Sequence, residues 1–264
     1  MKNLNYLNYD DEKDRPPKLF RYMDHDKLDD ILNSSSLYFC RMDRFGDKLE
    51  GITPYQMIEV IGLYKYRFLG SVTNHNFSDI EKKKIYNSNE KSFQVTKAEI
   101  NQNQKKIFVS CWYCQNFESQ AMWDIYGNEG VAIRIDRNEL NTILENSLTD
   151  SEGESFAGFV DYKDFNDVFH DNNEELWSKS NPFFRKHISF NHEDEYRFAL
   201  YRPKFKNNEG IKINTAILES ESLEIIISPK VDHNNFERKK AEILERQPHL
   251  KIRKSDLTMW NLLK

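Results

Sequence analysis

The segment from residue 107 to residue 136 constrains the fold more than any other part of the chain. It reads IFVSCWYCQNFESQAMWDIYGNEGVAIRID and carries two of the four tryptophans and two of the three cysteines. Its opening residues are dense in β-branched and aromatic side chains, which predicts a strand over residues 107–113. A short helix over residues 117–126 follows and ends at Gly127, and a second strand covers residues 131–135.

The side chains of the first strand divide into two faces, because successive residues of a strand point to opposite sides. Phe108, Ser110 and Trp112 share one face. A small hydroxyl flanked by large aromatic rings indicates a pocket floor, but a buried strand with a hydrogen-bonded serine gives the same pattern. The helix that follows carries one stripe, formed by Phe117, Ala121 and Ile125, with Met122 beside it.

The composition argues against several classes of protein. The 264 residues are 38% hydrophobic and 31% charged, and the 13% aromatic content compensates for this polarity because each ring buries a large area. The net charge of -5 argues against a general nucleic-acid-binding surface. No apolar run reaches membrane-spanning length, and the polar N-terminus does not resemble a signal peptide. With three cysteines we expect no disulfide framework and a cytoplasmic location.

Strand and helix patterns continue along the rest of the chain. Further strands are predicted at residues 18–23, 37–40, 156–162, 193–201, 211–217, 223–228 and 250–253. Further helices are predicted at about residues 26–33, 55–69, 137–148, 174–187 and 235–246. Because strands outnumber helices in the second half, we expect an α+β fold with a mixed or antiparallel sheet and flanking helices.

We expect a single α+β domain over residues 18–264, preceded by a loose N-terminal arm at residues 1–17. Residues 70–106 are rich in Asn, Lys, Ser and Glu, so we expect a polar insertion there rather than a separate domain. Residues 43–51, with the sequence DRFGDKLEG, form a turn-rich, acidic loop.

Two acidic residues, Glu193 and Glu195, are two positions apart in a predicted strand, so both carboxylates project to the same side. Their backbone positions would be about 7 Å apart. Such a pair can stabilise a cationic transition state and activate a nucleophile. The alternative is the solvated face of an edge strand, on which Arg197 is an ordinary ion-pair partner.

Arg21 lies in the sequence KLFRYM, among apolar and aromatic neighbours. A guanidinium in such surroundings needs an anion close to it. That anion is either the phosphate of a ligand or a carboxylate of the protein in a structural salt bridge, and the sequence leaves both open.

The C-x-x-C motif from Cys111 to Cys114 is a poor metal site. Residues three apart on a strand face opposite sides, and no second Cys pair or spaced His pair completes a tetrahedral shell. We therefore expect no metal site.

Several segments resemble a bacterial family known only as a domain of unknown function. They are LFRYMDHDKLDDILNSSSLYF, FGDKLEG, FVSCW, AMWDIYGNEGVAIRID and EDEYRFAL. The Met-Trp…Tyr-Gly…Gly and Glu-x-Glu-Tyr-Arg patterns are the more specific of these. The resemblance covers most of the chain outside residues 70–106, and by itself it implies no activity.

The order of the elements also resembles that of the ADP-ribosyltransferase superfamily, which implies an ADP-ribosyltransferase-like fold. In one branch of it, an arginine on the first strand binds NAD, a serine motif on a middle strand supports the pocket, and a Glu-x-Glu motif performs the chemistry. Arg21, Ser110, and the pair Glu193 and Glu195 stand at the corresponding positions. The serine motif departs from the family pattern, because its second serine is absent here.

This resemblance implies NAD as the substrate and gives each residue a role. Arg21 would bind the pyrophosphate, and Trp112 or Tyr38 would stack on the nicotinamide. Glu195 would hydrogen-bond the ribose 2′-hydroxyl and stabilise the oxocarbenium ion, while Glu193 would deprotonate or orient the acceptor. The candidate catalytic residues are Glu195, Glu193 and Ser110. The candidate cofactor-binding residues are Arg21, Tyr38, Trp112, Trp123 and Tyr126.

These inferences favour an NAD-consuming ADP-ribosyltransferase or NAD glycohydrolase, and the superfamily suggests a bacterial toxin or antiphage effector. The partners would be the nucleotide substrate, a protein or nucleic-acid acceptor and a cognate inhibitor, with no membrane. The alternative is a non-catalytic nucleotide- or protein-binding module of a defence system. A nuclease is a weaker candidate, because two acidic residues without a supporting Asp/Lys pattern make a poor metal site.

Overall fold

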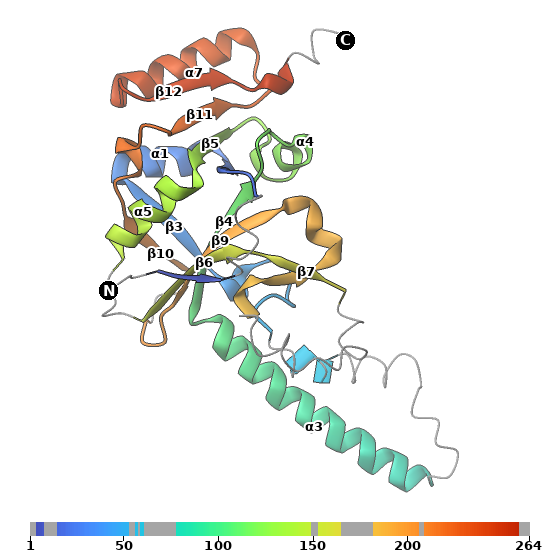
Figure 1. The fold of residues 1–264 in the computed structure, drawn as a ribbon. Coiled ribbons are helices and arrows are strands. Elements are labelled where there is room, and N and C mark those ends of the chain that lie inside the picture. Colours follow the sequence, from blue (N-terminus) through green and yellow to red (C-terminus); the bar gives the residue numbers. More distant parts are fainter. Residues whose placement is uncertain are drawn as a thin grey trace.

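The computed structural model describes residues 4–7, 15–52, 56–57, 59–60, 78–148, 153–164, 182–205 and 209–258. Over these residues the chain forms an α+β fold with a mixed, largely antiparallel sheet and several helices (Figure 1), as the sequence predicted. The α-helices are α1 (His25–Ser34), α3 (Asp79–Gln104), α4 (Gln120–Met122), α5 (Arg137–Ser147) and α7 (His233–Arg246).

The main sheet contains ten of the described strands. They are β1 (Asn5–Leu7), β2 (Lys18–Met23), β3 (Ser36–Arg41), β4 (Ile107–Cys114), β5 (Val131–Asp136), β6 (Glu154–Phe159), β9 (Glu195–Tyr201), β10 (Gly210–Asn214), β11 (Glu224–Ile227) and β12 (Lys251–Lys254). Strands β7 (Asp161–Lys163) and β8 (Arg185–His187) form a separate parallel pair. The short helical turns are η2 (Met42–Arg44), η3 (Trp123–Gly127), η6 (Pro182–Phe184), η7 (Ile188–Glu193) and η8 (Ile217–Glu219).

Strand β4 is the centre of the sheet. On one side it pairs with antiparallel β9 from Ile107 to Tyr113. On the other side it pairs with β3 near its start and with β2 at its end. Between these two pairings, the residues from Ser110 to Trp112 have no strand partner on that side within the described ranges. The sheet is therefore split between β2 and β3.

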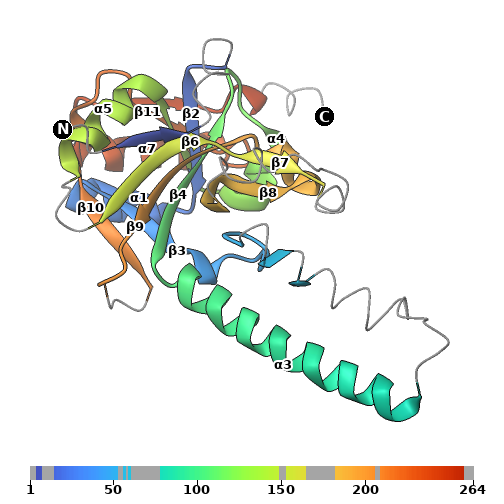
Figure 2. The ribbon, with the colours of Figure 1, turned by 60° about the horizontal axis from the view of Figure 1, so that its bottom comes forward.

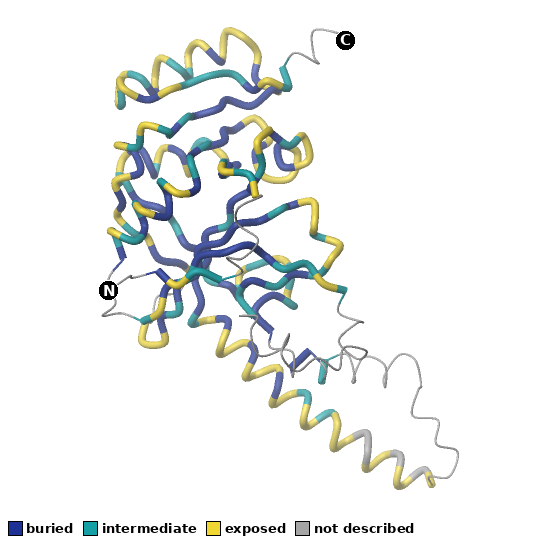
Figure 3. Tube along the Cα trace, in the orientation of Figure 1, coloured by how far each residue is buried: buried dark blue, intermediate teal, exposed yellow. Residues whose placement is uncertain are grey.

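The main core lies between the sheet and helices α1, α5 and α7. Strand β4 contributes Phe108 and Trp112 to it, and β9 contributes Tyr196 and Phe198. The alternate residues of both strands point to the opposite face, which confirms the predicted period-two separation. Figure 3 shows that the strands are largely buried, whereas α3 and α7 carry much of the exposed surface.

Helix α1 follows β2 directly, and capping residues at its two ends determine where it begins and ends. The side chain of Asp24 caps the N-terminus by accepting a hydrogen bond from the backbone N–H of Lys27 at 2.9 Å. Ser35 ends the helix in the left-handed region, with a φ of 47°. The buried residues of α1 are Leu28, Ile31 and Leu32, the apolar stripe that its sequence predicts.

Helix α3 projects away from the body of the molecule (Figures 1 and 2). A capping box between Ser78 and Glu81 begins it. Its C-terminal part packs against the fold through Thr96, Ile100 and Gln104, which are buried. The polar insertion expected at residues 70–106 is thus, over Asp79–Gln104, one long and mostly exposed helix, and residues 70–77 lie outside the described ranges.

The helix predicted over residues 117–126 differs from the structure in its extent and in its buried face. Helix α4 is short and continues directly into η3, one turn of π-helix. Phe117 and Ile125, members of the predicted stripe, are 64% and 54% exposed, whereas Met122 and Trp123 are buried. The stripe prediction was wrong because the large Trp123 ring packs edge-on against Tyr22 and decides which face turns inward.

Other segments differ from their predictions more locally. Over residues 182–187 the predicted helix is replaced by η6 and β8, while residues 174–181 lie outside the described ranges. Most of the helix predicted at residues 55–69 also lies outside them. Strand β1 falls within the expected N-terminal arm and pairs in parallel with β6. None of the helices in the described ranges has the length and apolar content that a membrane crossing requires.

Candidate functional site

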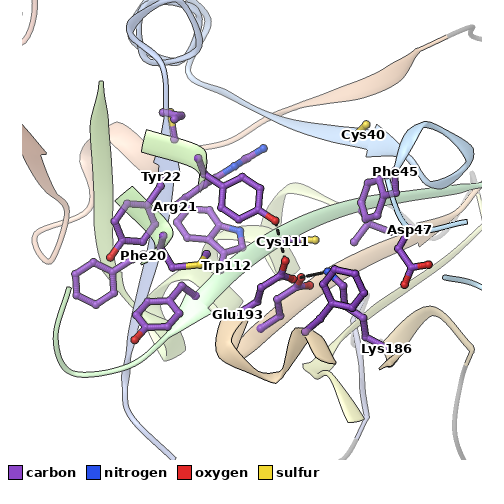
Figure 4. A pocket seen from close by; sticks show the side chains of 18 of the residues that line it. Phe20, Arg21, Tyr22, Cys40, Phe45, Asp47, Cys111, Trp112, Lys186 and Glu193 are labelled. Carbon is purple, nitrogen blue, oxygen red and sulfur yellow. Dashed lines mark hydrogen bonds and ion pairs between the residues drawn. The ribbon is translucent and has the colours of Figure 1, made fainter. Parts of the chain in front are cut away.

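A cavity of about 580 Å³ lies where the sheet is split (Figure 4). Small-molecule sites in proteins have volumes of roughly 300–1,000 Å³, so this cavity has the size of a ligand site. Its walls come from β2, β3, β4, the α4–η3 segment, β8, η7, the start of β9 and the FGDKLEG loop, which we define as residues 45–51. Segments far apart in the sequence therefore contribute to one site.

Arg21 reaches from β2 towards β3. Its Nη2 donates a hydrogen bond to the backbone carbonyl of Tyr38 at 2.9 Å, and its guanidinium lies 5.7 Å from the centroid of the Trp112 ring. Its Nη1 is buried and has no hydrogen-bond partner among the described residues. Burial lowers the pKa of Arg21, because removal from water disfavours the charged form. The cavity wall thus holds a cation with an unused donor.

A buried ionic network occupies another part of the cavity wall. Lys186 forms ion pairs with Glu50 at 3.3 Å and with Glu195 at 3.1 Å, and it also donates to Glu193. Arg197 forms ion pairs with Glu50 at 2.6 Å and with Glu195. All five side chains are almost inaccessible to solvent. Three carboxyl groups therefore share two cations, which leaves one negative charge unbalanced if all of them are ionised.

The two carboxyls of the Glu-x-Glu motif have different environments. Burial alone would raise the pKa of Glu195, but Arg197 and Lys186 lower it below its ordinary value. Burial, together with the neighbouring Glu195, raises the pKa of Glu193 to about 7. Glu195 is therefore ionised at neutral pH, whereas Glu193 exchanges a proton near neutrality, as a general acid or base requires.

Backbone geometry separates these two glutamates further. Glu193 is the last residue of η7, and Asp194 follows in the left-handed region with a φ of 39°. The strand predicted from residue 193 therefore begins at Glu195. Both carboxyls nevertheless line the cavity, since Lys186 contacts each of them.

Tyr126 connects η3 to the acidic network. Its hydroxyl donates a hydrogen bond to Glu193 Oε1 at 2.8 Å (Figure 4). The ring is 47% exposed, so it stands at the rim of the cavity. A π-helical turn shifts the residues after it relative to an α-helix, and such turns are frequent at functional sites. The turn that places Tyr126 is of this kind.

Aromatic side chains form much of the remaining wall. Phe45, Tyr22 and Phe190 line the cavity, and the ammonium of Lys186 lies 4.5 Å from the centroid of the Phe190 ring. Aromatic faces of this kind can stack on a planar ring of a ligand. The Trp112 ring also lines the cavity but is only 1% exposed.

The structure brings together five of the eight residues that the sequence singled out. The cavity-lining residues among them are Arg21, Trp112, Tyr126, Glu193 and Glu195. Ser110, Tyr38 and Trp123 do not line the cavity.

The other three candidates have contacts of their own. Ser110 is buried and accepts a hydrogen bond from Trp112 Nε1 at 3.0 Å, as a satisfied core serine does. Trp123 is fully buried and donates to Glu118 at 3.0 Å. Tyr38 contributes its backbone carbonyl to Arg21 rather than its ring.

Glu50 and Lys186 are functional candidates that the sequence reasoning missed. Glu50 lies in a loop and Lys186 in a short strand after Pro182, so neither belongs to a periodic pattern. The acidic character of the FGDKLEG loop was visible in the sequence, and Phe45, an apolar residue within the loop, was the available hint that the loop turns inward.

Metal ligation has no support in the described ranges, where no group of three or more His, Cys, Asp and Glu side chains could hold an ion. The cysteines are free. Cys111 lies in the cavity wall, and burial raises its pKa well above the ordinary value, which disfavours a reactive thiolate.

The chain was compared with known proteins. Residues 122–198 match the model of a family described as a protein of unknown function, DUF2971. The match supports the expected resemblance to an uncharacterised family, and it includes η3, Lys186 and both glutamates of the Glu-x-Glu motif. No curated protein and no solved structure shows significant similarity to the chain.

Proposed function

We propose that the cavity binds NAD and that the protein cleaves the bond between nicotinamide and ribose, as an ADP-ribosyltransferase-like enzyme or NAD glycohydrolase. The observation that carries this proposal is the presence, in one cavity, of an unpaired guanidinium nitrogen and a carboxyl with a pKa near 7. One group suits an anionic ligand and the other suits proton transfer at neutral pH.

Arg21 supports the binding half of the proposal. Its free Nη1 can donate to a phosphate oxygen, and charge-assisted hydrogen bonds of this kind are about twice as strong as neutral ones. Lys27 also lines the cavity, and its ammonium forms an exposed ion pair with Asp24 at 2.5 Å. The aromatic rings at the walls provide surfaces for the nicotinamide or the adenine.

The glutamates support the chemical half. When the bond from ribose C1′ to the nicotinamide nitrogen breaks, its electron pair goes to the pyridinium ring and nicotinamide leaves as a neutral molecule. The sugar becomes an oxocarbenium ion, which the ionised Glu195 stabilises electrostatically. A water or acceptor hydroxyl then bonds to C1′, and its proton passes to Glu193.

A non-catalytic nucleotide-binding module is the second candidate, and one observation favours it. Both oxygens of Glu195 are already paired, one with Lys186 and one with Arg197. A carboxylate engaged in this way can serve to hold the wall of a binding pocket. In either case we propose a setting in bacterial defence, with a cognate inhibitor as a partner.

The test is release of nicotinamide from NAD by the purified native protein. We expect Glu195→Gln and Glu193→Gln each to lower the rate by at least about 100-fold, the usual contribution of a positioned acid–base or electrostatic group. Glu237→Gln on the exposed side of α7 is the control and should leave the rate unchanged.

Three outcomes separate the candidates. Nicotinamide release with a mass gain on a protein or nucleic acid identifies a transferase, and release without it identifies a glycohydrolase. NAD binding without release identifies a binding module. If the native protein neither binds NAD nor releases nicotinamide, the proposal is refuted.

A further inference from the structure

The FGDKLEG loop is part of the site and has no role in the proposed chemistry so far. Phe45, Gly46, Asp47 and Glu50 from this loop line the cavity. Figure 4 shows Asp47 beside Phe45, separated in the view from Phe20 and Tyr22 at the other side. The loop therefore forms a wall that faces the aromatic end of β2.

The loop is fixed in place from two directions. In the cavity, the carboxylate of Glu50 forms ion pairs with Lys186 and Arg197. Behind the loop, the carbonyl of Glu50 accepts a hydrogen bond from Gln104 Nε2 of α3 at 2.7 Å. Both contacts are buried, so they are shielded from competition with water.

The loop is also closed by its own contacts. Lys48 Nζ donates to the carbonyls of Asp43 and Phe45 at 2.9 and 2.7 Å. Gly51 adopts a φ of 75°, which glycine tolerates at little cost. These contacts fix the conformation of the loop. A polar atom of the loop that has no hydrogen-bond partner therefore stays without one.

Asp47 has such an atom. Its Oδ1 accepts a hydrogen bond from the backbone N–H of Leu49 at 2.9 Å, which orients the carboxylate. Its Oδ2 is buried and has no hydrogen-bond partner among the described residues. A buried acceptor without a donor is costly, and a ligand that brings a donor removes that cost.

We propose that Asp47 is a ligand-binding residue that determines specificity: its Oδ2 accepts a hydrogen bond from a hydroxyl or amino group of the nucleotide whose phosphate Arg21 binds. This inference rests on the proposed nucleotide site and adds the orientation in which the nucleotide binds there. The acceptor-rich phosphate lies at Arg21, and a donor-bearing ring or sugar lies at the FGDKLEG loop.

Asp47→Asn is the sharpest variant, because its geometry is almost unchanged. The amide oxygen of the asparagine still accepts the hydrogen bond from Leu49 N–H, so the amide NH₂ takes the place of Oδ2. An NH₂ group only donates, so it cannot accept a hydrogen bond from a donor group of the ligand. Asp47→Ala removes both the acceptor for Leu49 N–H and the unpaired Oδ2, and it provides a second measurement. Asp232→Asn is the matched control, since Asp232 caps the exposed end of α7 and does not line the cavity.

Dissociation constants are measured by calorimetry in the Glu193→Gln background, in which turnover is slowed. We expect Asp47→Asn to weaken NAD binding by at least about tenfold, the value of one hydrogen bond to a charged group, and Asp232→Asn to have no effect. Thermal unfolding of each variant confirms that it is folded.

Three NAD analogues locate the donor. Nicotinic acid adenine dinucleotide lacks the carboxamide NH₂, nicotinamide hypoxanthine dinucleotide lacks the adenine amino group, and 2′-deoxy-NAD lacks a ribose hydroxyl. One of them should bind about tenfold more weakly than NAD to the parent protein, and this difference should disappear with Asp47→Ala.

The inference alone is overturned if NAD binds and nicotinamide is released by the native protein while both Asp47 variants keep the parent affinity. It is also overturned if none of the three analogues binds more weakly than NAD to the parent protein, or if the analogue that does so keeps that difference in Asp47→Ala. Failure of the native protein to bind NAD or any analogue refutes the proposed function, and the assignment of Asp47 fails with it.

Discussion

Arg21 and Arg197 lie on strands that flank β4, but their surroundings are opposite, and Arg197 is fully buried whereas Arg21 is partly buried. Arg197 forms ion pairs with Glu50 and Glu195 and donates to the carbonyl of Phe183 at 3.0 Å. Arg21 has the carbonyl of Tyr38 and the face of the Trp112 ring, and its Nη1 is unpaired.

The difference shows how burial of the same group can serve two purposes. The charge of a buried cation that contacts two carboxylates is neutralised within the protein, so its removal leaves buried negative charges without compensation. The charge of a cation without a carboxylate partner is not neutralised until an anionic ligand binds, so its removal affects binding more than folding. We therefore expect the Arg197 side of the cavity to maintain the fold and the Arg21 side to recognise the ligand.

The largest expected effect is on the Arg197 side. Arg197→Met leaves Glu50 and Glu195 with Lys186 as their remaining ion-pair partner, and we expect a loss of about 3–5 kcal/mol of unfolding free energy. Denaturant unfolding measures this. A loss below about 1 kcal/mol would contradict the view that Arg197 stabilises the fold.

The second effect concerns Arg21. Arg21→Met should weaken NAD binding by roughly 10–100-fold, because charge-assisted hydrogen bonds to phosphate are lost, while the unfolding free energy changes by less than about 1 kcal/mol. Calorimetry and denaturant unfolding measure the two quantities.

Arg134→Met is a matched control, because Arg134 lies on neighbouring β5, pairs with Glu224 at 3.1 Å and does not line the cavity. It should leave the affinity for NAD unchanged. A destabilised Arg21→Met with native affinity would reverse the roles that the comparison gives to the two arginines.

The third effect concerns the charge balance of the network. The pKa of Glu193 is raised from 4.5 to about 7, so the folded protein holds a proton there that the unfolded chain releases. The resulting stability is present below pH 4.5 and is lost as the pH rises to about 7. Glu50, whose pKa is also raised by burial, acts in the same direction.

Unfolding free energies between pH 4.5 and 7 measure this effect. Glu193→Gln should flatten the decline by up to about 1.4 kcal/mol per pH unit. An equal pH dependence in native and variant proteins would mean that Glu193 titrates normally and that another group carries the linkage.

Much of the fold could be predicted from the sequence, because its strands have clear patterns. The alternation correctly put Phe108 and Trp112 on one face of β4, and Tyr196 and Arg197 on opposite faces of β9. The expectation that Arg21 binds an anion also rests on its apolar neighbours and stays a prediction, since its printed hydrogen-bond partner is the Tyr38 carbonyl. In each case the information is local, within a few residues of the position.

The remaining features depend on tertiary contacts that no local pattern carries. Glu50 meets Lys186 across more than a hundred residues of sequence. Trp123, at the start of the π-helical turn that carries Tyr126, packs against the ring of Tyr22 in β2. The sequence also could not choose between the two interpretations of Ser110, because only the position of Trp112 Nε1 decides it.

The split between β2 and β3 has a mechanical consequence. These strands exchange no ladder hydrogen bonds with each other in the described ranges, and each is held through its own pairing with β4. One contact that spans them is the hydrogen bond from the Arg21 side chain to the Tyr38 carbonyl. An anion that arrives at Arg21 would engage the same side chain that bridges the two strands, so ligand capture and this bridge are coupled.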